Sequence, residues 1–181
     1  MKILIFGVSN VGKTTTGEIL ANKLGYKFYD LDDEVKKNLG ISLEEFTNTG
    51  DLYWRDKQRG NVIKEILKKE EDLVLAISPI SYPESFKKQI ITDDIILIEL
   101  YDQAEHIFSR LVFSDENDKL YIDNTYKNKY RNYFMKEIKA DLDWYGAVNR
   151  KLGIKNRIFV NNEKQEIVAD RIIDMLPKLK R

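Results

Sequence analysis

The sequence of 181 residues contains no cysteine. Disulfide bonds, thiolate catalysis and cysteine-ligated zinc are therefore excluded, and this lack is typical of cytoplasmic proteins. Only three prolines occur, and neither they nor any low-complexity segment marks a domain boundary. No apolar run approaches the roughly 20 residues that cross a bilayer, and the short run that opens the chain is not expected to be a signal peptide. We therefore expect one cytoplasmic globular domain over residues 1–181.

The chain also lacks an excess of charge. Its 30 lysines and arginines are balanced by 30 aspartates and glutamates, so no basic field points to nucleic acid or to a membrane surface. Tyrosines and tryptophans are frequent between residues 121 and 145, where they could stack on bases. Because the chain is neutral, packing between helices is favoured instead. We expect neither nucleic acid nor a membrane as partner, and a monomer or a homodimer.

Short apolar segments alternate with segments of helical periodicity along the whole chain. Helices are expected at residues 13–24, 52–69 and 164–179, from about residue 35, and in a long segment that ends near residue 150. This order predicts an α/β fold of three layers, in which helices cover both faces of a parallel five-stranded sheet. Residues 112–150 are expected to supply a helical lid and acceptor-side helices. The expected strands cover residues 2–6, 26–29, 72–78, 94–100 and 157–160.

Pairs of polar residues three apart predict where helices begin. The spacing of a capping box occurs at Ser42 with Glu45, at Ser81 with Glu84, and at Asp102 with Glu105. The loops after the strands are of special interest because the carboxyl ends of parallel strands meet at one edge of a sheet. Residues 7–14, 30–34, 78–83 and 101–102 are therefore expected to share one rim.

Residues 7–16 read GVSNVGKTTT and directly follow the first expected strand. They satisfy the whole Walker A pattern, between a strand and a helix as the motif requires. In such a loop backbone N–H groups turn toward the β-phosphate, and the helix N-terminus adds positive partial charge. Lys13 would reach the β- and γ-phosphates, and the Thr14 hydroxyl would bind Mg²⁺. The predicted cofactors are ATP and Mg²⁺, and the predicted nucleotide-binding residues in this loop are Gly7, Asn10, Val11, Gly12, Lys13, Thr14 and Thr15.

The pattern alone does not distinguish kinases from other phosphate-loop proteins. A GTPase would need Asn-Lys-x-Asp, and the nearest match, NKYR at residues 128–131, lacks the acid. The third expected strand ends in Ser78, so a Walker B aspartate is missing as well. A small kinase, with acids elsewhere that help to hold the metal, is therefore favoured over a hydrolytic NTPase.

An acidic pair, Asp30 and Asp32, follows the second expected strand. If the strand continues briefly, both carboxylates lie on the same side, where one would bind Mg²⁺ and the other would act as base for an acceptor hydroxyl. Alternatively, the acids simply complement the N-terminus of the next helix. Arg55 lies on a helix beside Trp54, where it could bind an anionic acceptor or make a structural contact.

Together these residues resemble shikimate kinase, within the nucleoside-monophosphate-kinase-like P-loop superfamily. The resemblance is continuous over about the first 60 residues, through GVSNVGKTT, the Asp-x-Asp of GYKFYDLDDEV and the segment GDLYWR that ends in Arg55. It implies an ATP-dependent small-molecule kinase in which Asp30 is the metal-side carboxylate. Asp32 would then bind the acceptor as the base, and Arg55 would bind the acceptor too. Arg110 resembles the arginine near adenine in these kinases.

The second half departs from the family, which implies a diverged acceptor site. Where shikimate kinases have three glycines after the third strand, this chain reads Ser78-Pro79-Ile80. Neither VFSDENDKL in the lid nor KADLDWYGA in the following helix holds the arginines that grip the phosphate and the acceptor carboxylate. The single histidine, His106, is expected to be a surface or packing residue. Candidate substitutes for the missing arginines are Lys119, Arg131 and Arg150, and candidates for the acceptor side are Trp144 and Tyr145.

Three classes of function stay open from the sequence. The preferred class is a kinase for a small hydroxylated or phosphorylated acceptor, and nucleosides and nucleotides compete with shikimate-like acids as that acceptor. The second class is a nucleotide-binding regulatory module without transfer activity, which the missing arginines would suit. The third is a hydrolytic NTPase, and the missing base-reading and Walker B signals weigh against it.

Overall fold

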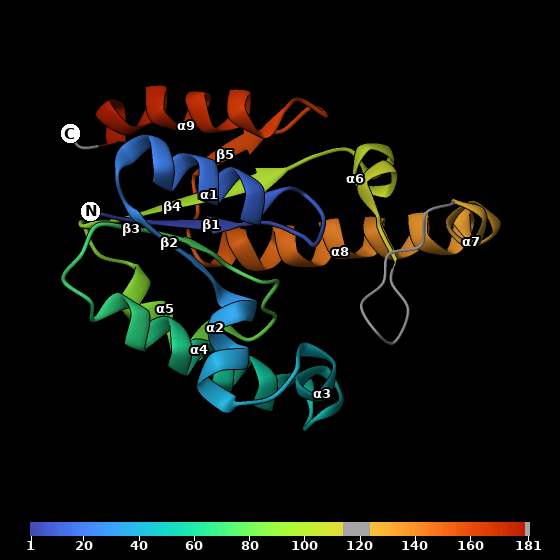
Figure 1. The fold of residues 1–181 in the computed structure, drawn as a ribbon, viewed down its shortest axis with the longest axis horizontal. Coiled ribbons are helices and arrows are strands. Elements are labelled where there is room, and N and C mark those ends of the chain that lie inside the picture. Colours follow the sequence, from blue (N-terminus) through green and yellow to red (C-terminus); the bar gives the residue numbers. More distant parts are fainter. Residues whose placement is uncertain (114–123, 180–181) are drawn as a thin grey trace.

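Five short strands form one parallel sheet in the order β2-β3-β1-β4-β5. The structure is a computed structural model that describes residues 1–113 and 124–179 (Figure 1). The predicted α/β fold with a five-stranded parallel sheet is confirmed, and every predicted strand overlaps an observed one. The strands are β1 (Lys2–Phe6), β2 (Lys27–Asp30), β3 (Leu73–Ala76), β4 (Ile95–Tyr101) and β5 (Asn156–Phe159).

Helices cover both faces of this sheet. In Figure 1, α1 and α9 lie together on one side, and α2, α4 and α5 lie on the other. The long helix α8 packs against α6, and its C-terminal end reaches the core beneath β1 and β3. The helices described are α1 (Lys13–Leu24), α2 (Leu31–Leu39), α3 (Leu43–Asn48), α4 (Leu52–Leu67), the 3₁₀ helix η1 (Pro83–Ser85), α5 (Lys87–Ile90), α6 (Ala104–Arg110), α7 (Thr125–Lys129), α8 (Arg131–Lys151) and α9 (Gln165–Leu179).

The side chains of β1 alternate between two hydrophobic clusters, as the geometry of a strand requires. Ile3 and Ile5 belong to the cluster that includes α1 and α9, and Leu4 and Phe6 belong to the cluster that includes α2 and α4. All four side chains are buried. Because both faces of the strand are covered, the segment is an unbroken apolar run rather than an alternation of apolar and polar residues.

One of the three predicted capping pairs is confirmed. Ser42 Oγ accepts a hydrogen bond of 3.1 Å from the backbone N–H of Glu45 at the start of α3. The pair at Asp102 and Glu105 is wrong, because α6 begins after Gln103 and no side chain caps it. The Asp102 carboxylate is buried instead, where other donors hold it.

The predicted helix start within residues 81–84 is confirmed, but the cap by Ser81 is wrong. Pro83 begins the short helix η1, and the residue that flanks it is Tyr82, without a side-chain cap. Ser81 Oγ instead accepts a hydrogen bond of 3.0 Å from Trp144 Nε1 on α8. The hydroxyl that the local pattern assigned to a helix cap is therefore used in a contact with α8 instead.

The loops at the carboxyl ends of the strands meet at one rim, as predicted. Thr14 donates a hydrogen bond to Asp30, and Ser78 donates one to Asp32, so the loops after β1, β2 and β3 are joined directly. Gly7 in the first loop lies against the end of β4. The rim is thus the place where the sheet topology collects polar side chains from distant parts of the sequence.

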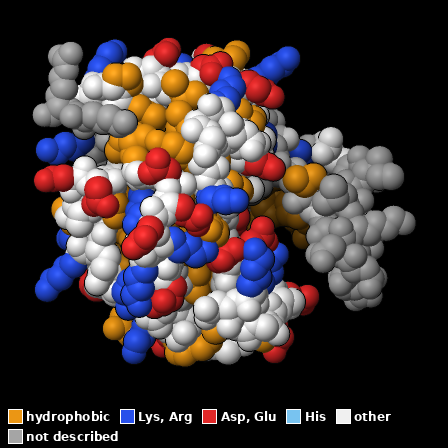
Figure 2. Space-filling view, turned by 60° about the vertical axis from the view of Figure 1, so that its left-hand side comes forward, with side chains coloured by type: hydrophobic (Ala, Val, Ile, Leu, Met, Phe, Trp, Pro, Cys, Tyr) orange, Lys and Arg blue, Asp and Glu red, His pale blue; other side chains and the backbone are white. Residues whose placement is uncertain are grey.

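Charged side chains of both signs are mixed over the face shown in Figure 2. This distribution agrees with the balanced composition of the chain. Among the residues that the structure describes, no helix is both long and apolar enough to cross a membrane.

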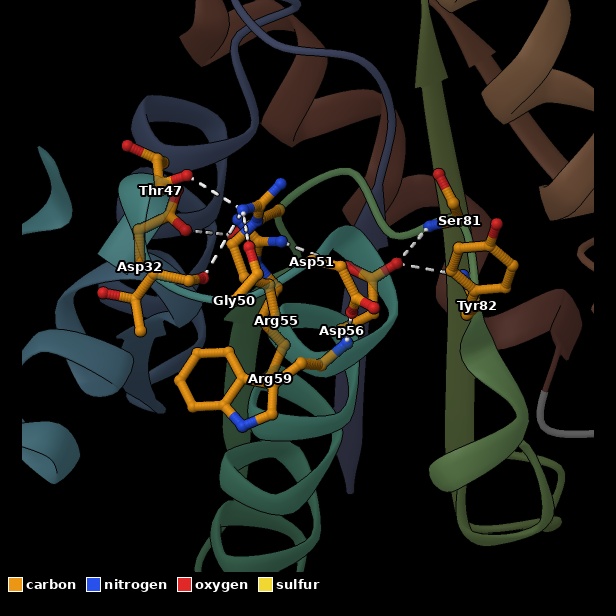
Figure 3. A network of polar contacts seen from close by, with 12 residues as sticks. Asp32, Thr47, Gly50, Asp51, Arg55, Asp56, Arg59, Ser81 and Tyr82 are labelled. Atoms are coloured by element: carbon orange, nitrogen blue, oxygen red, sulfur yellow. Dashed lines mark hydrogen bonds and ion pairs between the residues drawn. The ribbon is translucent and has the colours of Figure 1, made fainter. Parts of the chain in front are cut away.

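A buried ion pair joins α4 to the segment after β3. The Asp56 carboxylate is fully buried and accepts hydrogen bonds from Arg59 Nη1 at 3.1 Å and from the backbone N–H groups of Ser81 at 2.8 Å and Tyr82 at 3.0 Å (Figure 3). The Arg59 guanidinium lies over the Phe46 ring, 5.0 Å from its centroid. One fully buried carboxylate thus satisfies three donors from two parts of the chain.

We predict that Asp56→Ala lowers the free energy of unfolding by about 3–5 kcal/mol, because it leaves the Arg59 charge buried without its partner. For a chain of this size the melting temperature should fall by roughly 10 °C. Denaturant and thermal unfolding measure both quantities. The exposed neighbour Lys57 provides the control, since Lys57→Ala should change stability by less than about 0.5 kcal/mol. A cost for Asp56→Ala as small as the control's would contradict the structural role of this ion pair.

Candidate active site

The phosphate loop joins β1 to α1 in a backbone conformation that two glycines allow. Gly7 has a φ of 142°, and a Cβ atom there would lie 2.4 Å from the carbonyl oxygen of Leu100 on β4. Gly12 has a φ of 105° and immediately precedes α1. Between them Val11 is fully buried and anchors the loop in the core. The unpaired N–H groups at the start of α1 are thereby held in place for an anion.

Lys13, the first residue of α1, bends back over the loop. Its Nζ donates a hydrogen bond of 2.8 Å to the carbonyl oxygen of Val8. Burial lowers the pKa of Lys13 to about 8, while the nearby carboxylates of Asp32 and Asp30 oppose this shift. The ammonium group therefore lies where the predicted phosphate site and the predicted acidic pair meet.

A cavity of about 380 Å³ opens over the loop and brings most of the predicted nucleotide-binding residues together. Gln165 also lines it, and no motif predicted this residue. Its side chain approaches Gly12, because the first turn of α9 packs over the loop. Gly7 and Val11 shape the loop rather than line the cavity. The lining residues are Asn10, Gly12, Lys13, Thr14, Thr15, Arg110 and Gln165.

Arg110 is fixed at the edge of this cavity. Its Nε donates to the carbonyl oxygen of Asn10 at 3.1 Å, and its Nη2 donates to Asp102 Oδ2 at 2.6 Å. His106 Nδ1 lies 2.7 Å from the other oxygen of the same carboxylate. Although burial opposes its ionisation, hydrogen bonds from Arg110 and His106 hold the pKa of Asp102 below its usual value. His106 thus has the packing role expected of it, and Asp102 orients Arg110.

Asp30 and Asp32 lie at the junction of β2 and α2. The strand continues one residue beyond the expected range, to Asp30, but does not reach Asp32, and α2 begins at Leu31, earlier than the expected residue 35. Asp30 Oδ1 accepts a hydrogen bond of 2.9 Å from the Asp32 N–H, and its Oδ2 accepts one of 2.7 Å from Thr14 Oγ1. Asp30 therefore combines the helix cap with a contact to the phosphate loop.

Asp32 stands in the first turn of α2 and is joined to the segment after β3. Ser78 Oγ donates a hydrogen bond of 2.6 Å to Asp32 Oδ1, and Ser78 is only 7% exposed. The sequence indicated Ser78 as the residue that ends a strand without a Walker B acid and begins the segment in place of the family's three glycines, but gave it no partner. No local signal marks the pairing, because the two residues are 46 positions apart and meet only through the order of the strands.

Arg55 lies in the first turn of α4 and turns back toward the chain that precedes it. Its Nη1 donates to the carbonyl oxygens of Thr47 and Gly50, both at 2.9 Å (Figure 3). These contacts fix the guanidinium against the segment that precedes α4. The predicted role of Arg55 in binding an acceptor stays a prediction.

The face of α8 that looks onto the phosphate loop carries acids. Glu137 and Asp141 line a cavity of about 150 Å³ together with residues 8–10 of the loop. Burial and, after it, the charge of Glu137 raise the pKa of Asp141. One turn further along α8, Tyr145 hydrogen-bonds Ser81 and faces Ser78 across a narrow space.

Of the candidate substitutes for the missing arginines, the two that the structure describes, Arg131 and Arg150, are not brought to this face. Lys119 lies outside the described residues. Arg131 packs over the Phe108 ring, 4.6 Å from its centroid, and Arg150 is exposed near the end of α8. Neither arginine lines the described cavities beside the phosphate loop.

Comparison with known proteins agrees with this geometry. The family model described as shikimate kinase matches residues 9–177. The chain belongs to the shikimate kinase family. A shikimate kinase of Persephonella marina is 27% identical over 160 residues, which cover 83% of this chain and 96% of that protein. One of Flavobacterium johnsoniae is 25% identical over 178 residues, which cover 97% and 98%.

Solved structures of shikimate kinases share the fold. The enzyme from Acinetobacter baumannii in complex with shikimate superposes with a TM-score of 0.76 at 21% identity, over 99% of this chain and 94% of that one. The enzyme from Aquifex aeolicus gives a TM-score of 0.70 at 23% identity, over 98% and 96%. The predicted family is thus confirmed, and with it an ATP-dependent phosphotransferase that uses a hydroxyl group as acceptor.

We predict that nucleotide affinity depends on the protonation of Lys13. Above pH 8, the pKa of Lys13 in the free protein, its ammonium loses the proton, so the dissociation constant for ATP should rise by up to about tenfold per pH unit. Between pH 8 and 9.5, binding should take up a proton, because the phosphates stabilise the charged form. Calorimetry in buffers of different ionisation enthalpy measures both effects. Lys13→Ala should bind ATP weakly and without this pH dependence, and wild-type affinity in that variant would refute the phosphate-loop assignment.

Proposed function

We propose that the protein transfers the γ-phosphate of ATP to a hydroxyl group of a small acceptor that binds between Asp32, residues 78–82 and α8. The observation that carries this proposal is the pair of hydrogen bonds from Thr14 to Asp30 and from Ser78 to Asp32. They unite the phosphate loop, the acidic pair and the segment after β3 on one rim. The cavity beside them has room for nucleotide phosphates and ends at Arg110.

Mg²⁺ fits the oxygen atoms at the start of α1. Thr14 Oγ1 and Asp30 Oδ2 lie 2.7 Å apart, and Mg²⁺ prefers hydroxyl, carboxylate, phosphate and water oxygens. Thr14 would bind the ion directly, and Asp30 would bind it through water. When bound, the ion neutralises charge on the β- and γ-phosphates.

Three side chains bind the phosphates, remove the proton and hold the acceptor. Lys13 exchanges the carbonyl oxygen of Val8 for oxygens of the β- and γ-phosphates. Asp32 accepts the proton of the acceptor hydroxyl while the hydroxyl oxygen bonds to the γ-phosphorus. The bond from that phosphorus to the bridging oxygen breaks, and ADP leaves with the electron pair. Arg55 holds the acceptor with the guanidinium nitrogens that its backbone contacts do not use.

We predict that Asp32→Asn lowers kcat by about 10²- to 10⁴-fold, the usual contribution of a general base. Mg-ATP binding should stay unchanged, because Asp32 does not line the nucleotide cavity. Acceptor-dependent ADP release and calorimetry measure the two quantities. Asp33→Asn is the matched control, since Asp33 pairs with Lys36 on the outer side of α2.

The same assay separates the competing functions. Normal turnover by Asp32→Asn would show that another group removes the proton. ADP release that needs no acceptor would indicate a hydrolytic NTPase. Binding of Mg-ATP without ADP release for any acceptor, nucleosides and nucleotides included, would indicate a regulatory module.

We also propose that the acceptor carries no negative charge on the side that faces α8. Glu137 and Asp141 occupy that face, and Arg59 is already neutralised by Asp56. Both acids are exposed, and like charges a few ångströms apart in such surroundings repel by about 1–2 kcal/mol. A neutral or amine-bearing polyol therefore suits this site better than a carboxylate or a nucleotide phosphate does.

Shikimate and its methyl ester provide a matched test, because they differ in one negative charge and share their hydroxyl groups. We predict that kcat/KM is about tenfold higher for the ester, and that Asp141→Asn reduces this preference severalfold. Asp143→Asn, two residues away and outside the lining of the cavity that Asp141 shares with the loop, should leave the preference unchanged. A clear preference of the wild-type protein for shikimate would refute the charge assignment and leave the kinase function intact.

The proposal places the reaction in the cytoplasm, on a monomer or homodimer without nucleic acid or membrane partners. The balanced charge and the lack of cysteine support this part. Analytical ultracentrifugation with and without Mg-ATP measures the oligomeric state.

A further inference from the structure

Ser78 follows strand β3, which is hydrogen-bonded to β1 in the sheet. The Ile77 N–H donates a hydrogen bond of 2.8 Å to the carbonyl oxygen of Ile5, so parallel pairing with β1 continues up to the residue before Ser78. Ser78 itself is 7% exposed, and its Oγ lies 2.6 Å from Asp32 Oδ1. A short hydrogen bond from a hydroxyl to a carboxylate is stronger than one between neutral groups. The bond therefore ties a catalytic carboxylate to a rigid part of the sheet.

The other end of the same segment is held by buried groups. Asp56 accepts hydrogen bonds from the backbone N–H groups of Ser81 and Tyr82 (Figure 3). Trp144 Nε1 donates a hydrogen bond to Ser81 Oγ. Pro79 lies between the two ends and restricts the backbone there. Residues 78–82 thus have contacts to β1, α2, α4 and α8, and Ser78 has little freedom to follow Asp32 if that side chain turns.

Asp32 depends on this contact for its orientation. Its backbone N–H is fixed by Asp30 Oδ1, which sets the start of α2 but leaves the side-chain torsions free. The contact from Ser78 engages Oδ1. A carboxylate held through one oxygen presents the other oxygen, Oδ2, in a defined direction.

We infer that Ser78 is a positioning residue for phosphoryl transfer: its hydroxyl holds Asp32 Oδ1 so that Oδ2 faces the acceptor hydroxyl. This inference rests on the proposed function, in which Asp32 is the base. Ser78 acts through Asp32 and not on the nucleotide, because it does not line the cavity over the phosphate loop. Its loss should therefore affect the chemical step and spare the binding of Mg-ATP.

The test compares Ser78→Ala with Ser78→Thr, using the acceptor on which the wild-type protein shows the highest turnover. Ser78→Ala should lower kcat by about 10- to 100-fold and leave the dissociation constant of Mg-ATP within about twofold. Ser78→Thr, which keeps the hydroxyl, should restore most of kcat. Ser85→Ala is the matched control, because Ser85 Oγ is buried just beyond the segment and has no hydrogen-bond partner among the described atoms.

Each other result has a distinct meaning. Wild-type kcat in Ser78→Ala would overturn the inference and leave the kinase function standing. A parallel loss of kcat and Mg-ATP affinity, or an equal loss in Ser85→Ala, would also overturn it, since a general weakening of the fold would then explain the effect. Failure of the wild-type protein itself to release ADP with any acceptor would refute the proposed function, and the inference with it.

Discussion

The parallel pairing of β1 with both β3 and β4 is the constraint on which the whole site depends. Because these strands run in the same direction, the loops that follow them meet at one edge of the sheet. Both faces of β1 are buried, so a slip of one residue would move Ile3 and Ile5 out of one core cluster and into the other. The hydrophobic packing of the sheet thereby fixes the distance between the phosphate loop and the acidic pair.

Two carboxylates that are close in sequence have different surroundings on this edge. Asp30 is engaged at both oxygens, by the N–H of Asp32 and by the hydroxyl of Thr14. Asp32 is held at one oxygen by Ser78. A carboxylate with both oxygens occupied suits a structural and metal-side role, and one with an oxygen left over suits proton transfer. The separation of the proposed roles thus follows from the partners, and not from the residue type.

The two halves of the site differ in how closely they follow the family pattern. The nucleotide side keeps the loop, the lysine and an arginine at its edge. On the proposed acceptor side, Arg59 is paired with Asp56, and backbone carbonyl groups engage one nitrogen of Arg55. Asp141 adds a negative charge near Tyr145 on α8. A change of acceptor can thus arise in one half while the phosphate chemistry of the other half is kept.

Local patterns were sufficient to place the five strands along the sequence, the phosphate loop and the start of α3. They failed at Asp102 and Ser81, because donors from elsewhere in the fold took the oxygens that a capping box would have used. They also missed Gln165, whose place over Gly12 depends on how α9 packs against α1. Where the competing partner is distant in sequence, periodicity and spacing contain no information about it.

The sequence by itself therefore determined the α/β class, the phosphate loop and the kinase chemistry. The alternation of elements, the Walker A motif and the resemblance over about the first 60 residues can all be recognised along the chain. Only the tertiary structure decided that Ser78 would hold Asp32, that Asp56 would fix residues 81–82, and that an acidic face of α8 would look onto the loop. These contacts join residues on different elements. They exist only once the hydrophobic clusters have set the sheet and its helices in place.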